Sequence, residues 1–264
     1  MILTADSGST KTTWLADGQK FITQGINPFH MNTEQMQRVI QEELLTQFPS
    51  ASLIKEIHFY GAGCTKEKAP LLEDILRRTF PQATTVEVGS DMLGAARALF
   101  DNKEGIACIL GTGANSCLYD GHDIVGNISP MGYILGDEGS GAVLGKTLLN
   151  TLYKGEHCDF IPVFEKETGL TLPDIIECVY RQPMPNRFLA SLAPFIKAHI
   201  DEDWVDKMVV EAFQLFFQHN VVHYNRADLP CSFVGSIAYY FEEQLRKAAA
   251  NCGFHIGTIM KEPL

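Results

Sequence analysis

The same order of short segments occurs twice in this 264-residue chain. Residues 2–24 contain a strand-like run, the bend "DSGSTK", the run "TTWLA", the pair Asp17-Gly18 and the run "KFITQ". Residues 105–127 repeat that order with "GIACIL", "GTGANS", "SCLY", Asp120-Gly121 and "DIVGN". Asp-Gly between apolar runs favours a tight hairpin, because a type I′ turn needs positive φ angles. Two three-strand meanders in the same order predict a duplicated unit.

Helices and strands are expected to alternate after the first meander, which gives an α/β unit with a mixed sheet. The periodicity predicts a helix over 33–48 with Thr33 as its N-cap, a strand over 54–63, a helix over 66–80, a strand over 83–91 and a helix over 92–100. After the second meander, helical patterns dominate from residue 140 to about 225, and strands are expected within 231–241 and 254–264. We therefore expect two domains, residues 1–105 and 106–264.

Composition excludes several classes of protein. A hydrophobic fraction of 45% and a charged fraction of 20% are typical of globular chains. The net charge of −11 argues against a nucleic-acid partner, whose phosphates require a basic surface. No run of about 20 apolar residues predicts a membrane span, and Asp6, Lys11 and Asp17 interrupt any leader-like start. Seven cysteines without a Cys-x-x-Cys pair fit free thiols in a reducing cytoplasm.

Each glycine bend is a candidate phosphate site. In the first bend, Gly8 lies between two serines and is followed by Thr10 and Lys11, so backbone N–H groups, hydroxyls and a cation are close together. Asp6 could hold Mg²⁺ through water, since this ion prefers oxygen ligands. The second bend, residues 111–116, has similar chemistry. An ordinary hairpin explains either bend alone, but the two together could hold one polyphosphate from two sides.

Carboxylates stand at two further strand-to-helix or loop-to-helix junctions, and each has two interpretations. Asp91 follows a strand and precedes a helix, so it could accept a proton from a substrate or only cap that helix. In "GDEGSG", Asp137 could contact a ligand, or the acidic pair could serve only the helix N-terminus with Ser140 as the cap. His219 and His223 have the spacing of zinc ligands on a helix, but surface or core histidines explain them better.

The bends "DSGSTK" and "GTGANS", Asp91 and "MGYILGDEGSG" together resemble the N-acetylglucosamine kinases and the related BadF/BadG-type ATPases. Both belong to the actin–hexokinase–heat-shock-ATPase superfamily, and the resemblance covers nearly the whole chain. It implies two RNase H-like, actin-like ATPase domains with ATP in the cleft between them. The chain departs from the family at Ser7 and Ser9, where glycines are common, and at Ser236, where a second glycine is usual.

The resemblance also implies roles for individual residues. Asp91 would be the catalytic carboxylate, and Asp6 would hold Mg²⁺, directly or through water. The residues that would contact ATP are those of the two phosphate bends and of an adenosine motif: Asp6, Gly8, Ser9, Thr10, Lys11, Gly111, Thr112, Gly113, Gly235 and Ser236. The residues that would contact the sugar are Asn27, Asn115, Gly132 and Asp137.

The implied reaction is ATP-dependent phosphorylation of an amino sugar, with the 6-hydroxyl of N-acetylglucosamine as the expected acceptor. One alternative is an ATPase that drives a partner enzyme. Another is a sugar or nucleotide sensor without turnover. The assembly state is open, with a homodimer as one alternative. Pro263 after the last strand favours the start of a helix, so a further helix beyond residue 264 is expected from the family pattern.

Overall fold

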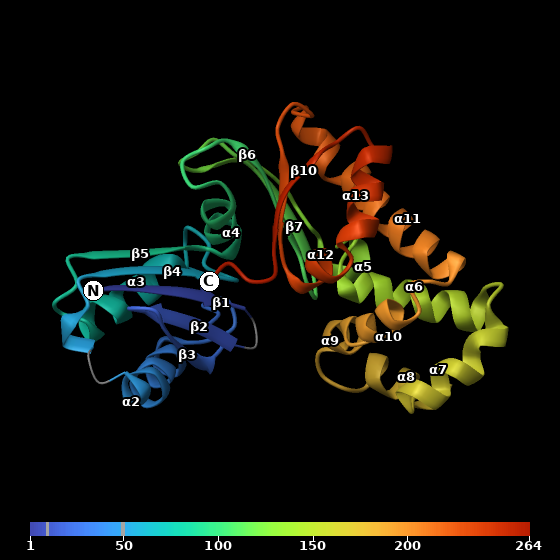
Figure 1. The fold of residues 1–264 in the computed structure, drawn as a ribbon. Helices are drawn as coiled ribbons and strands as arrows, with labels where there is room; N and C mark the ends of the chain where they lie inside the picture. The colour runs from blue at the N-terminus through green and yellow to red at the C-terminus, as the bar shows by residue number, and fades with distance from the viewer. Residues whose placement is uncertain (9–10, 49–50) are drawn as a thin grey trace. The chain divides into compact units, whose positions relative to one another are not determined.

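The computed structural model describes residues 1–8, 11–48 and 51–264, and these form two compact units (Figure 1). The first unit is Met1–Ala98 with Pro263–Leu264, and the second is Leu99–Glu262. Their boundary lies inside helix α4 (Asp91–Phe100), whereas the sequence placed it after residue 105. The end of α4 belongs with the second unit because the Phe100 ring packs directly against Gly105, where the next strand begins.

The first unit contains a five-stranded mixed sheet in the order β3-β2-β1-β4-β5. Its strands are β1 (Ile2–Ser7), β2 (Lys11–Ala16), β3 (Gln19–Gln24), β4 (Glu56–Gly61) and β5 (Thr85–Ser90). The first three are antiparallel, as the meander predicted, and β4 and β5 extend the sheet in parallel from β1. Asp17 and Gly18 have φ angles of 49° and 75°, so the predicted tight turn is confirmed.

One face of this sheet carries the core of the first unit. Leu3, Trp14 and Phe59 are fully buried there against α1 (Thr33–Arg38), the π-helix Val39–Leu44 and α3 (Ala69–Thr79). The predicted helix over 33–48 is thus divided into α1, the π-helical turns and α2 (Leu45–Gln47). Its cap is Asn32 rather than Thr33, because Asn32 and Gln35 form a reciprocal capping box. Helix α4 lies on the other side of the sheet (Figure 1).

The second unit repeats the first: its strand order is β10-β9-β6-β7-β8, which is the same order read from the other edge. Its strands are β6 (Gly105–Leu110), β7 (Ala114–Tyr119), β8 (Ile124–Ile128), β9 (Cys231–Val234) and β10 (Ile256–Met260). This confirms the predicted duplication. The second turn is not the predicted type I′ pair, however. It is a loop in which the Asp120 carboxylate accepts from the N–H groups of His122 and Asp123.

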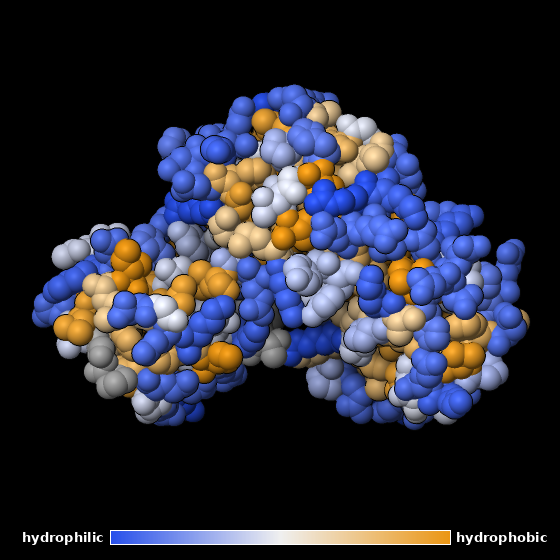
Figure 2. All heavy atoms as spheres, viewed as in Figure 1, coloured by the Kyte–Doolittle hydropathy of each residue, from blue (hydrophilic) through white to orange (hydrophobic). Residues whose placement is uncertain are grey.

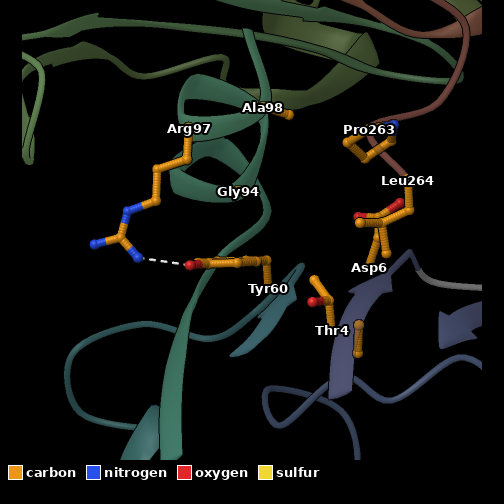
Figure 3. A pocket seen from close by; sticks show the side chains of 9 residues that line it. Thr4, Asp6, Tyr60, Gly94, Arg97, Ala98, Pro263 and Leu264 are labelled. Atoms are coloured by element: carbon orange, nitrogen blue, oxygen red, sulfur yellow. Dashed lines mark hydrogen bonds between the residues drawn. The ribbon is translucent and has the colours of Figure 1, made fainter. Parts of the chain in front are cut away.

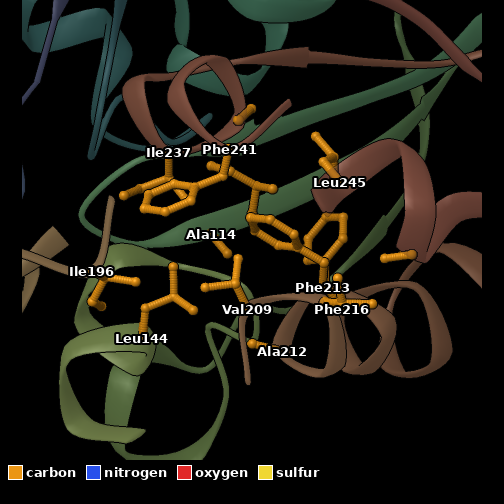
Figure 4. Close-up of a cluster of buried hydrophobic side chains, with 14 of the residues drawn as sticks. Ala114, Leu144, Ile196, Val209, Ala212, Phe213, Phe216, Ile237, Phe241 and Leu245 are labelled. Atoms are coloured by element: carbon orange, nitrogen blue, oxygen red, sulfur yellow. The ribbon is translucent and has the colours of Figure 1, made fainter. Parts of the chain in front are cut away.

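Helices fill most of the remaining second unit, as predicted. They are α5 (Gly132–Leu135), α6 (Gly141–Lys154), α7 (Ile161–Thr168), α8 (Leu172–Tyr180), α9 (Pro185–Ala190), α10 (Ala193–Ala198), α11 (Asp203–His219), α12 (Ser236–Tyr240) and α13 (Glu242–Asn251). Phe213, Phe216 and other side chains of α11 form the core with the sheet and with α12 and α13 (Figure 4). The face in Figure 2 is mainly hydrophilic. Within the described residues, no helix is long and apolar enough to span a membrane.

Candidate functional site

The first phosphate bend connects β1 to β2. The Gly8 N–H donates to the Lys11 carbonyl at 3.0 Å, and a Cβ at Gly8 would meet only that oxygen, at 3.9 Å. Among the described residues, no side chain therefore crowds Gly8, although its N–H is engaged within the bend. Ser9 and Thr10, which the resemblance assigned to ATP, lie outside the described residues.

Ser7 has a structural role that the sequence did not reveal. Its buried hydroxyl lies 2.7 Å from the Thr12 hydroxyl, accepts from the Ile26 N–H at 2.9 Å and donates to the Ile26 carbonyl. Serine at this position therefore ties the bend to the loop that follows β3. That loop carries Asn27, whose Oδ1 accepts from the Phe29 N–H at 2.9 Å. Gly63, with φ of 78°, lets the Asn27 side chain pack directly on its backbone.

Asp91 lies at the carboxyl end of β5, half-buried, as the first residue of α4. Ser90 Oγ accepts from the Leu93 N–H at 3.2 Å, and Asp91 Oδ1 accepts from the Met92 N–H at 2.9 Å. The capping contacts expected from the sequence are thus present. Burial nevertheless raises the pKa of Asp91 above its ordinary value, although the Met92 bond lowers it. The thiol of buried Cys64 is close, and burial together with Asp91 raises its pKa to about 12.

A pocket of about 210 Å³ in the first unit opens beside Asp6 (Figure 3). Its lining residues are Thr4, Ala5, Asp6, Tyr60, Gly94, Arg97, Ala98, Pro263 and Leu264. Arg97 Nη1 donates to the Tyr60 hydroxyl at 2.5 Å and to both Glu87 carboxylate oxygens at 2.7 Å. Burial raises the pKa of Glu87, but bonds from Arg97 and His58 outweigh this effect and leave the pKa below its ordinary value. This network, which sequence reasoning missed, attaches α4 to β4 and β5.

The second phosphate bend connects β6 to β7 and lies on the first turn of α6. The carbonyls of Gly111 and Thr112 accept from the N–H groups of Gly141 and Ala142 at 2.8 and 3.1 Å. Ser140 caps this helix as predicted, since its Oγ accepts from the Val143 N–H at 3.2 Å. A Cβ at Gly111 would meet no atom of the described residues within 4 Å, so no described side chain crowds the bend there.

Asp137 is held beside this bend. It has a left-handed φ of 56°, and its carboxylate accepts from the Ala114 N–H. A Cβ at Gly113 would lie 3.1 Å from Asp137 Oδ2, so the glycine permits this approach. Burial and the neighbouring Glu138 charge raise the pKa of Asp137 to about 6. The structure thus brings one predicted sugar residue and one predicted phosphate residue together.

Asn115 and Gly132 lie in the same unit. Asn115 Oδ1 accepts from Asn127 Nδ2 at 3.0 Å and from the Ser116 N–H at 2.9 Å, so Asn127 is a positioning partner that the sequence did not suggest. Gly132 has φ of 75° and begins the short, exposed helix α5. The Gly136 N–H donates to the Gly132 carbonyl at 2.7 Å, which places Gly132 at the start of the loop that ends in Asp137.

The predicted adenosine motif lies at the turn from β9 to α12. Gly235 has φ of 129°, and its N–H donates to the Met260 carbonyl at 2.9 Å. A Cβ there would overlap the Leu110 carbonyl, just before the second phosphate bend. Ser236 is exposed as the first residue of α12. The structure therefore brings the predicted adenosine motif and the second predicted phosphate bend together.

The described residues contain no group of three or more His, Cys, Asp or Glu side chains that could hold a metal ion. Zinc binding by His219 and His223 therefore has no support in this part of the chain. A magnesium ion fits one carboxylate, because Mg²⁺ keeps several waters and takes other ligands from phosphate oxygens. Half-buried Asp6, next to the first bend, fits that donor set.

No protein-family model matches the chain. A Clostridium acetobutylicum N-acetylmuramic acid/N-acetylglucosamine kinase is 26% identical over 210 residues, which are 72% of this chain and 66% of that protein. A Porphyromonas gingivalis structure described as a "putative N-acetylglucosamine kinase" is 47% identical, with a TM-score of 0.92, over 100% of this chain and 95% of that one. A Chromobacterium violaceum structure with the same description has a TM-score of 0.74 at 18% identity, over 97% and 93% of the two chains, and shares the fold.

The duplicated sheets and the two glycine bends, together with the relative at 47% identity, identify a sugar kinase of the actin–hexokinase–heat-shock-ATPase superfamily. Within it, the chain belongs to the N-acetylglucosamine kinase family, as the relative at 47% identity, matched over 95% of its chain, shows. The resemblance stated from the sequence is confirmed at this level.

Proposed function

We propose that this protein transfers the γ-phosphoryl group of ATP to the 6-hydroxyl of N-acetylglucosamine. The observation that carries the proposal is the site of Asp91. This carboxylate stands at a strand end with a raised pKa, and Ser90 meets the capping need of α4 beside it. A carboxylate in this state suits a group that orients a hydroxyl and accepts its proton late. The family relationship supports a sugar as the acceptor.

The chain's own residues would then have distinct tasks. Asn27 and Asn115, each fixed by a hydrogen bond to its Oδ1, and Asp137, fixed by the Ala114 N–H, would orient the sugar. The two bends would bind phosphate oxygens, which could approach closely at Gly8 and Gly111 because neither residue has a side chain, and Gly235 would let adenosine approach the strand end. Asp6 would hold Mg²⁺ through water; when bound, this ion neutralises charge on the phosphates.

N-Acetylmuramic acid is a second candidate acceptor. The Clostridium relative is named for both N-acetylmuramic acid and N-acetylglucosamine. Both sugars carry the same 2-acetamido group and 6-hydroxyl. The proposed roles of Asn27, Asn115 and Asp137 apply to either of them.

A coupled assay of ADP release tests the proposal with glucose, N-acetylglucosamine, N-acetylmannosamine and N-acetylmuramic acid. We expect release that depends on N-acetylglucosamine, with ³¹P NMR showing a 6-phosphate monoester. Release that is the same without sugar would instead indicate an ATPase. Sugar binding by calorimetry without release would indicate a sensor.

A further inference from the structure

Glu138, which directly follows Asp137, is held by the end of helix α11. His219 Nδ1 lies 2.8 Å from Glu138 Oε1, and Asn220 Nδ2 donates to Glu138 Oε2 at 3.4 Å. Both carboxylate oxygens are therefore engaged by adjacent residues of a distant segment. Asn220 is buried, and its Nδ2 also donates to the Phe216 carbonyl at 3.2 Å, which fixes the amide on the helix.

The next residue of the loop is also fitted to α11. Gly139 has φ of 74°, and a Cβ there would lie 3.1 Å from the Phe213 ring and 3.2 Å from Phe216 Cβ. Because Phe213 and Phe216 belong to the core of the second unit, the loop rests on a rigid surface (Figure 4). Glu138 and Gly139 together therefore fix the loop from its C-terminal side.

The electrostatic effects involve the same residues. Burial raises the pKa of Glu138, but the bonds from His219 and Asn220 outweigh it, so the pKa lies below its ordinary value. An ionised Glu138 raises the pKa of adjacent Asp137, whose own carboxylate accepts from the Ala114 N–H. A continuous set of contacts thus leads from α11 through Glu138 and Asp137 to the second phosphate bend.

We propose that His219 and Asn220 are positioning residues, which fix Glu138 and thereby hold Asp137 in place for the sugar. This inference rests on the proposed function, in which Asp137 contacts the acceptor. It gives His219 a task in the sugar site, whereas the next histidine, exposed His223, has none.

Three variants of the full chain test the proposal: His219→Ala, His219→Asn and, as the matched control, His223→Ala. Losing one bond to this half-buried carboxylate should raise the KM for N-acetylglucosamine about three- to tenfold in His219→Ala. The KM for ATP should change less. His219→Asn, whose amide nitrogen replaces Nδ1 and can still donate to Glu138, should recover most of the loss, and His223→Ala should match the wild type. Equal losses for sugar and ATP, or a wild-type KM in His219→Ala, would overturn the proposal.

A measurement without sugar separates this inference from the proposed function. Titration of the Glu138 carboxyl by ¹³C NMR should show a higher pKa in His219→Ala than in the wild type or in His223→Ala, because a bond that lowers the pKa is gone. An unchanged Glu138 pKa would show that His219 does not hold this carboxylate. If the wild type phosphorylates none of the four sugars but the Glu138 pKa still rises in His219→Ala, the proposed function is wrong. The contact between His219 and Glu138 is then still supported.

Discussion

At Asp91, capping and catalysis can be separated by two substitutions of neighbouring residues. Asp91→Asn keeps an oxygen that can accept from the Met92 N–H but loses the capacity to take a proton. We expect kcat to fall about 10²- to 10⁴-fold, as for loss of a general base, with ATP still bound. Ser90→Ala removes the bond from the Leu93 N–H, which should cost about 0.5–2 kcal/mol of stability and leave kcat nearly unchanged. Steady-state kinetics and thermal melts of both variants measure these effects. Near-normal turnover in Asp91→Asn would mean that Asp91 only caps the helix.

Asp137 should make stability depend on pH. Its pKa is raised from 3.8 to about 6, so the folded state favours the protonated carboxyl. The stabilisation of the fold by the protonated Asp137 carboxyl is complete below the pKa that this group has in the unfolded chain. It is lost as the pH rises through about 6, the pKa in the folded state. Asp137→Asn, which never ionises and can still accept from the Ala114 N–H, should therefore melt higher than the wild type at about pH 7.5, with a smaller difference near pH 5. Differential scanning fluorimetry at both pH values checks this. A variant that melts lower at the higher pH would mean that the ionised carboxylate stabilises the fold.

At the scale of elements, the attachment of α4 depends on one partly buried cation. Arg97 bonds to Tyr60 and Glu87, and Gly94 of the same helix lets the Tyr60 side chain pack against its backbone. The Arg97 and Glu87 side chains are 34% and 35% exposed, whereas Arg78 and Asp74 on α3 are 78% and 57% exposed. We expect Arg97→Met to lower the free energy of unfolding by about 1–2 kcal/mol, or roughly 3–6 °C in Tm. The control Arg78→Met should lower it by less than about 0.5 kcal/mol. An equal decrease in Tm for the two variants would contradict this account.

The elements that could be predicted from the sequence are those set by local chemistry. The two meanders, the turn at Asp17-Gly18 and the Ser140 cap follow from spacing and residue type, and the structure has all three. The Asn32 cap could also have been predicted from the sequence, because Gln35 three residues later completes its capping box. Contacts between distant segments could not be predicted from the sequence: Glu138 and His219 are 81 residues apart, and Tyr60 and Arg97 are 37 residues apart. Such pairs depend on how helices pack on sheets, which no local pattern records.

At the scale of the whole molecule, the candidate residues are divided between two units that two chain segments connect. Asp6, Asn27 and Asp91 belong to the first unit, while the second phosphate bend and Asp137 belong to the second. The proposed reaction needs both groups at one pair of substrates, and it needs water excluded from the phosphoryl group. We therefore expect the radius of gyration to change when N-acetylglucosamine and a non-hydrolysable ATP analogue bind together. Small-angle X-ray scattering measures it, and an unchanged radius would argue against a hinged closure.

The matching strand orders also have a consequence for how the chain folds. In each unit the meander forms between neighbouring segments, but the first parallel pair joins segments that are separated along the chain. In the first unit β1 pairs with β4. In the second unit β6 pairs with β9, which is further along the chain because the whole helical segment from α5 to α11 lies between them. Because closing a longer loop costs more entropy and non-local pairing slows folding, the first sheet should be complete before the second. In pulse-labelling hydrogen exchange during refolding, the amides of β4 should become protected earlier than those of β9, so that one architecture is assembled twice in the same chain at two different rates.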